Sequence, residues 1–69
     1  MKTGNERERI GSIITKLRKE KGYSQQELAE RAQITQSNLT RIENGKYSPG
    51  LDVLAKVATA LDKKIDFID

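Results

Sequence analysis

Apolar residues recur every three or four positions in four stretches of the chain, and this spacing is typical of helices with one buried face. We expect the four faces to form the core, with these members: Ile10, Ile13, Ile14 and Leu17; Leu28, Ala29 and Ala32; Leu39 and Ile42; Val53, Leu54, Val57, Ala58 and Leu61. The pattern therefore predicts an all-α fold, a compact bundle of four helices that occupies residues 6–62.

Residues that commonly begin and end helices divide these stretches. Gly22 is a natural stop for a first helix over roughly residues 6–21. Ser24 is a natural cap for the second helix. A three-residue turn then leads to Thr35, which caps a third helix that ends at Asn44–Gly45. The second and third helices are thus short and joined by a tight turn, as in a helix-turn-helix.

The two ends of the chain depart from the helical pattern. We expect residues 1–5 to be disordered. Residues 63–69 (KKIDFID) alternate apolar and polar side chains, which favours a short strand, although a last helical turn is the rival interpretation. A lone strand needs a second edge to pair with. We therefore expect this C-terminal tail to mediate dimerisation, through Leu61, Ile65, Phe67 and Ile68.

The third helix also carries a polar face. With Gln36 at 0° and ~100° per residue, Thr40, Ser37 and Arg41 fall near ~40°, ~100° and ~140°, opposite the two apolar residues. All four side chains can donate a hydrogen bond and none is acidic. Glutamine pairs well with adenine and arginine with guanine in the major groove of DNA. These four side chains form one polar stripe along the helix. The stripe alone is consistent either with base reading or with a solvated surface.

Composition narrows the classes of function. Thirteen lysines and arginines against ten acidic residues give a net charge of +3, which permits nucleic-acid binding without requiring it. The chain has no cysteine and no histidine, so the usual thiolate and imidazole chemistry is absent, and we expect no catalysis, metal or cofactor. It has neither a long apolar run nor a signal-like N-terminus, which predicts a cytoplasmic protein. Basic residues cluster at Lys16, Arg18, Lys19 and Lys21.

Three segments resemble the helix-turn-helix of the lambdoid phage repressor and Cro family, also called the XRE family. They are the run Gln25–Ala29 (QQELA), the pair Thr35–Gln36 and the ending Ile42–Gly45 (IENG). The resemblance covers roughly residues 7–62. It implies a sequence-specific regulator of transcription that binds double-stranded DNA, with the third helix in the major groove.

The resemblance also implies roles for single residues. Base contacts are expected at Gln36, Ser37 and Arg41, with Thr40 close by. Phosphate contacts are expected at Gln25, Thr35, Asn38, Asn44 and the backbone around Lys46. Gln25 is also expected to brace Gln36 at the start of the third helix. The free backbone N–H groups at the start of a helix can donate hydrogen bonds to phosphates, which agrees with this assignment.

Arg18 and Glu43 match an arginine and a glutamate that form an ion pair in the family. We expect a structural ion pair that also orients Arg18 towards the DNA backbone; a freely solvated pair is the alternative. Gln33 is a departure, since the family usually has glycine there. We expect a positive φ at Gln33 and a strain of ~1 kcal/mol in the turn.

One such module buries little surface on DNA, and the family dimerises on two half-sites about one helical turn, ~34 Å, apart. We therefore expect a homodimer that acts as a repressor on a palindromic operator. The alternative is an antitoxin-type protein, which binds a toxin partner and also represses its own operon. In that case, too, the tail would supply the additional protein contact.

Overall fold

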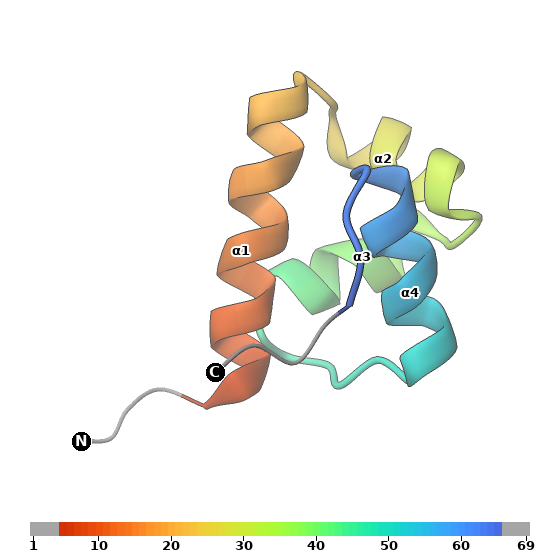
Figure 1. Ribbon diagram of the computed structural model, residues 1–69. Coiled ribbons are helices and arrows are strands. Elements are labelled where there is room, and N and C mark those ends of the chain that lie inside the picture. The colour runs from red at the N-terminus through yellow and green to blue at the C-terminus, as the bar shows by residue number, and fades with distance from the viewer. Residues whose placement is uncertain (1–4, 66–69) are drawn as a thin grey trace.

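The structure, a computed structural model, describes residues 5–65 and contains four helices (Figure 1). They are α1 (Glu6–Lys21), α2 (Gln25–Ala32), α3 (Gln36–Glu43) and α4 (Leu51–Ala60). No strand occurs between residues 5 and 65. The all-α prediction and the limits of the first helix are therefore confirmed.

The long helix α1 runs along one side of the molecule, and the three shorter helices pack together beside it (Figure 1). α1 packs against α3, and α2 packs against both α3 and α4. The residues buried between the helices are Ile14, Leu28, Ala29, Ala32, Leu39, Ile42, Val57 and Leu61. The apolar residues of α3 lie at the centre of this core. The inner face of α3 therefore fixes the orientation of the helix.

Short polar side chains begin three of the helices. Asn5, Ser24 and Thr35 each accept a hydrogen bond from the backbone N–H three residues later, at 2.9, 3.0 and 3.1 Å. Each satisfies one of the N–H groups that a helix start leaves free. Asn5 was expected in the disordered N-terminus but is the cap of α1. Gly50 occupies the cap position of α4 and offers no side-chain bond.

All four helices end in the same way, with one residue in the left-handed conformation. These residues are Gly22, Gln33, Gly45 and Asp62, with φ of 76°, 61°, 73° and 60°. Each of them, and the residue after it, donates a backbone N–H to a carbonyl in the last turn of the helix, which is a Schellman motif. The positive φ predicted at Gln33 is confirmed, and Gln33 is the left-handed end of α2.

The inner face of α1 differs from the prediction at two positions. Ile13 was expected in the core but is 40% exposed. Gly11 is buried instead, because a Cβ atom there would lie 2.5 Å from the carbonyl oxygen of Ile42 and 2.6 Å from that of Glu43. The backbone of α1 thus touches the last turn of α3. This close approach rotates α1 so that Ile14 enters the core and Ile13 does not.

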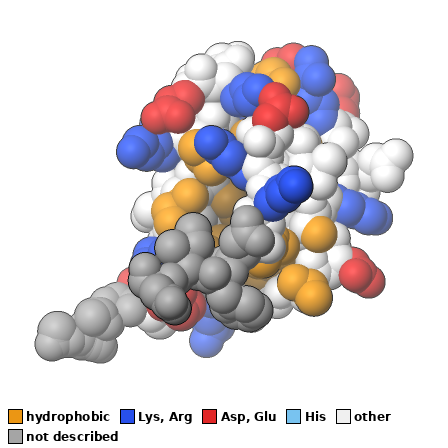
Figure 2. All heavy atoms as spheres, viewed as in Figure 1, with side chains coloured by type: hydrophobic (Ala, Val, Ile, Leu, Met, Phe, Trp, Pro, Cys, Tyr) orange, Lys and Arg blue, Asp and Glu red, His pale blue; other side chains and the backbone are white. Residues whose placement is uncertain are grey.

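A shallow apolar groove of about 250 Å³ separates α1 from α4, and hydrophobic side chains are visible on this face in Figure 2. Ile13 and Ile65, each about 40% exposed, lie along it. Leu61, expected at a dimer contact, is buried in its own core. Phe67 and Ile68 lie outside the described residues. Residues 63–65 form neither helix nor strand.

None of the helices in the described part of the chain is long and apolar enough to cross a membrane.

Candidate nucleic-acid interface

Four polar side chains of α3 lie together on the surface. Gln36, Ser37, Thr40 and Arg41 line one shallow depression of about 340 Å³. The first two and Arg41 are exposed, whereas Thr40 is half-buried. Within residues 5–65, the side chains of Gln36, Ser37 and Arg41 form no hydrogen bond. The structure therefore brings together the residues predicted to contact bases.

The opposite face of α3 explains why this stripe points outward. Leu39 is 0% exposed and Ile42 is 1% exposed, so both are anchored in the core. Residues three and four positions apart share a helix face. Burial of Leu39 and Ile42 therefore leaves the side of the helix that carries Gln36, Ser37 and Arg41 open to solvent.

The residues predicted to contact phosphates flank this stripe at the two ends of α3. Thr35, exposed, and Asn38, half-buried, lie at its start, and Asn44 and Lys46, both exposed, follow its end. The oxygen Oγ1 of Thr35 accepts the N–H of Asn38 at 3.1 Å, so this amide is already used within the protein. The side chains of Asn44 and Lys46 remain open to a partner.

Arg18 and Glu43 form a largely buried, two-pronged ion pair between α1 and α3. Nε of Arg18 lies 2.8 Å from Oε2 of Glu43, and Nη2 lies 3.1 Å from Oε1. The side chains are only 12% and 3% exposed, which excludes the freely solvated alternative. Nη1 donates to the backbone oxygen of Tyr23 at 2.9 Å. The guanidinium is committed to the fold, and this geometry does not support the predicted contact of Arg18 with phosphate.

Two more side chains complete the shell around the Glu43 carboxylate. Oε1 accepts from Oγ1 of Thr15 at 3.0 Å and from Nε2 of Gln25 at 3.1 Å. Burial by itself would raise the pKa of Glu43, but hydrogen bonds from Arg18, Gln25 and Thr15 outweigh it and hold the pKa below its ordinary value. Glu43 is thus an anion at neutral pH, with donors on both oxygens.

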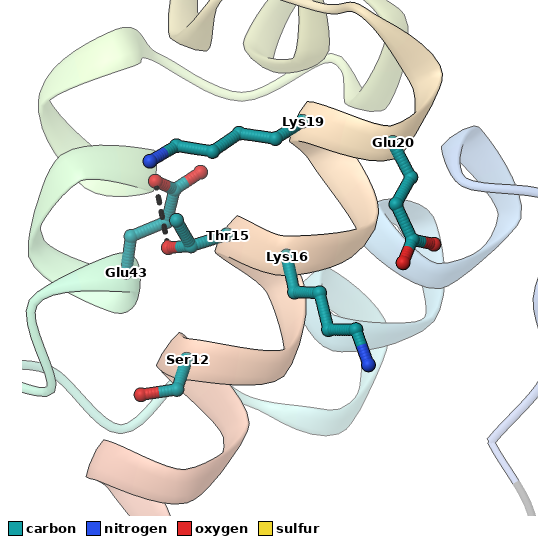
Figure 3. Close-up of a pocket in the computed structure, with 6 residues that line it drawn as sticks. All are labelled: Ser12, Thr15, Lys16, Lys19, Glu20 and Glu43. Carbon is teal, nitrogen blue, oxygen red and sulfur yellow. Dashed lines mark hydrogen bonds between the residues drawn. The ribbon is translucent and has the colours of Figure 1, made fainter.

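Sequence reasoning missed Thr15, which lies beside Glu43 in Figure 3. The signal was present in α1, where Gly11, Thr15 and Arg18 follow a spacing of four and three and so share a face. That face is the one that meets the last turn of α3. A glycine, a threonine and an arginine in this register mark a close and polar helix contact.

Gln25 connects this cluster to the exposed stripe. Its Nε2 donates to Glu43, and its Oε1 accepts the hydroxyl of Thr40 at 3.1 Å. The predicted brace from Gln25 to Gln36 is not formed; within the described chain the Gln25 amide bonds to Thr40 and Glu43 instead. Gln25 therefore holds the middle of α3, because Thr40 lies one turn beyond Gln36.

The basic cluster predicted at the end of α1 is divided by the fold. Arg18 points inward, and Lys21 pairs with Asp62 on the surface. Lys16 and Lys19 are exposed and line a depression of about 600 Å³ beside Glu43 (Figure 3). In Figure 3 the side chain of Lys19 extends towards Glu43 at the end of α3, whereas that of Lys16 points away from Glu43.

A short helix, a left-handed turn and a second helix with an exposed polar face together define a helix-turn-helix domain. The helix-turn-helix family HTH_3 matches residues 14–68. The chain therefore belongs to this XRE-type family of DNA-binding transcriptional regulators.

Known proteins resemble the chain over most of its length. The transcriptional regulator SinR of Bacillus subtilis is 46% identical over 57 residues, which are 81% of this chain and 51% of SinR. An uncharacterized HTH-type regulator of Methanothermobacter thermautotrophicus is 40% identical over 53 residues, 77% of each chain. The chain thus spans only about half the length of SinR.

Solved structures show the same fold. SinR in complex with DNA is 46% identical and superposes with a TM-score of 0.74 over 80% of this chain and 89% of that one. The restriction-modification controller protein C.AhdI of Aeromonas hydrophila is 33% identical, with a TM-score of 0.82 over 84% of this chain and 88% of that one. The four-helix arrangement is therefore that of known regulators.

Proposed function

We propose that the protein binds a specific sequence in double-stranded DNA, with α3 in the major groove, and represses transcription from that site. The observation that carries the proposal is the depression formed by Gln36, Ser37, Thr40 and Arg41. A helix surface without function favours residues of high helix propensity, such as glutamate and lysine. Gln36, Ser37 and Arg41 can donate hydrogen bonds and have no side-chain partner within residues 5–65, so they are suited to base edges.

We propose a separate role for each group of residues. Base contacts come from the depression, and Asn44 and Lys46 contact phosphates beside it. Lys16 and Lys19 add to the electrostatic attraction of the DNA backbone, which strengthens binding without selecting a sequence. The similarity to SinR, whose structure with DNA has been solved, supports this placement.

Selection of bound sequences from a random DNA pool tests the proposal. The protein should enrich one motif, and its affinity for that motif should exceed its affinity for unrelated DNA by about 1,000-fold or more. Affinity should also fall as salt concentration rises, because phosphate contacts release counterions. A selection that enriches no motif would contradict the proposal.

We propose further that the protein acts as a homodimer on a palindromic operator. The groove between α1 and α4 supports this, since Ile13 and Ile65 are exposed along it and a second copy would cover them. The apolar tail residues Phe67 and Ile68 continue from Ile65 in sequence. Leu61 would support the contact from beneath, because it is buried in its own core.

Deletion of residues 65–69 tests the dimer. The intact chain should sediment as a dimer and the truncated chain as a monomer that has lost most of its operator affinity. A truncated chain that remains a dimer would refute the role of the tail. If instead a different protein co-purifies with the intact chain and is lost on truncation, the toxin-binding alternative gains support.

A further inference from the structure

Three hydrogen bonds in series connect a buried ion pair to the exposed stripe of α3. Arg18 donates to Glu43, Glu43 accepts from Gln25, and the side-chain oxygen of Gln25 lies 3.1 Å from the hydroxyl of Thr40. The series crosses from α1 to α3, then to α2, and returns to α3 at Thr40. Thr40 also lines the depression formed with Gln36, Ser37 and Arg41, so its other side faces outward.

The direction of each hydrogen bond in this series is fixed by chemistry. Glu43 is ionised, because the Arg18 guanidinium donates to both of its oxygens and helps to hold its pKa low, and an ionised carboxylate can only accept. The atom of Gln25 that faces Glu43 must therefore be the amide nitrogen. The other atom of the amide is then the oxygen, which can only accept. The hydroxyl of Thr40 must therefore donate its proton to Gln25.

This commitment decides what Thr40 can offer to a partner. A hydroxyl has one proton and two lone pairs, and the proton of Thr40 is used inside the protein. Only lone pairs remain towards the depression. In the major groove, the hydrogen-bond donors are the exocyclic amino groups of adenine and cytosine, whereas guanine and thymine present acceptors.

We propose that Gln25 is a positioning residue that fixes Thr40 as a hydrogen-bond acceptor, so that Thr40 selects adenine or cytosine at one position of each DNA site. The inference rests on the proposed function, since it requires α3 in the major groove. It adds to that function a residue outside α3, Gln25, that determines which bases are accepted.

A purely structural role of Gln25 makes a different prediction. If Gln25 only holds α2 against α3, its removal weakens binding to all sequences alike and leaves the selected motif unchanged. If it fixes the polarity of Thr40, its removal frees the hydroxyl proton. Thr40 can then donate to guanine or thymine, and the preference at one position broadens. The identity of the selected bases separates the two roles.

The test is selection from a random DNA pool with the wild type and four variants. Gln25→Ala should accept all four bases at one position and keep the rest of the motif. Thr40→Val, which removes the hydroxyl and keeps the branched shape, should lose the adenine or cytosine preference, a loss of about 2- to 10-fold in discrimination for one hydrogen bond. Thr40→Ser should retain it. Gln26→Ala is the matched control, because Gln26 is the exposed neighbour of Gln25, and should leave the motif unchanged.

Each remaining outcome counts against the inference. A Gln25→Ala variant that keeps the wild-type preference at every position would overturn it, as would a Thr40→Val variant that still prefers an amino-bearing base. If Gln25→Ala does not fold, Gln25→Met, which keeps the length of the side chain, replaces it in the same measurement. A wild type that enriches no motif would refute the proposed function itself, whereas unchanged variants beside a selective wild type refute only the role of Gln25.

Discussion

Both sides of α3 carry polar side chains, but their surroundings differ. On the inner side, the Glu43 carboxylate accepts from Arg18, Thr15 and Gln25 and is nearly inaccessible to solvent. On the outer side, Gln36 and Arg41 have no hydrogen-bond partner within residues 5–65.

This difference separates polar groups that stabilise the fold from polar groups that serve a ligand. A buried charge without partners is strongly destabilising, so each donor around Glu43 has a structural consequence. An exposed polar group without partners is hydrated and costs little. We therefore expect substitutions on the inner side to change stability and substitutions on the outer side to change binding.

The largest expected effect follows from removal of the buried anion. Glu43→Ala leaves the Arg18 guanidinium buried without its partner, and we expect a loss of about 3–5 kcal/mol in the free energy of unfolding. Urea denaturation monitored by circular dichroism measures it. Glu6→Ala is the matched control, because it breaks an exposed ion pair with Arg9 and should not change stability measurably. Equal effects of the two substitutions would remove the distinction between buried and exposed pairs.

The pH dependence of stability sharpens the same point with a smaller change. The pKa of Glu43 in the folded chain lies below its ordinary value of 4.5, so its contribution is complete above about pH 4.5 and is lost as the pH falls through the folded value. The difference in unfolding free energy between the wild type and Glu43→Gln should be constant near neutral pH and narrow below about pH 4.5. A difference that widens in acid would show that the sign is wrong.

On the outer side, Arg41→Ala should reduce operator binding by about 1–3 kcal/mol and relax the preference at one position of each half-site. Its melting temperature should match that of the wild type, since Arg41 has no hydrogen-bond partner in the described chain. Fluorescence anisotropy and a repeated selection measure the two effects. Asn44→Ala is the control, because loss of a phosphate contact weakens all sequences alike. An unchanged motif for Arg41→Ala would contradict its role in base reading.

The smallest expected effect concerns the turn that joins α2, which carries Gln25, to α3. Gln33 has a φ of 61°, a conformation that glycine adopts without a Cβ penalty. Gln33→Gly should therefore be neutral or stabilising by no more than ~1 kcal/mol, because the greater entropy of glycine in the unfolded chain opposes the relief of strain. Thermal unfolding measures it, and a clear fall in melting temperature would count against strain at this turn.

Much of the fold could be predicted because it depends on local pattern. The spacing of Leu28 and Leu39 with their apolar neighbours identified the buried faces of α2 and α3, and Ser24 and Thr35 marked where these helices begin. The exposed stripe followed from the same periodicity, because a helix that buries one face exposes the other.

The inner network could be predicted only in part. The pairing of Arg18 with Glu43 came from resemblance, but its commitment to the fold did not, since the third donor contact of Arg18 is to the backbone of Tyr23. The partner of Gln25 was expected to be Gln36 and is Thr40. A side chain three bonds long can reach several residues of a neighbouring helix, and the crossing of the helices decides among them.

The amino-acid sequence by itself determined the number of helices, the starts of α2 and α3 and the polar face of α3, because helix periodicity and capping act over three or four residues. The tertiary structure decided what depends on how the helices cross. Gly11 lets α1 approach the last turn of α3, which turns Ile13 outward and brings Thr15 to Glu43. The tertiary structure also decided that Thr40 donates to Gln25 and can only accept from a partner, because this depends on a carboxylate and an amide brought together from two helices.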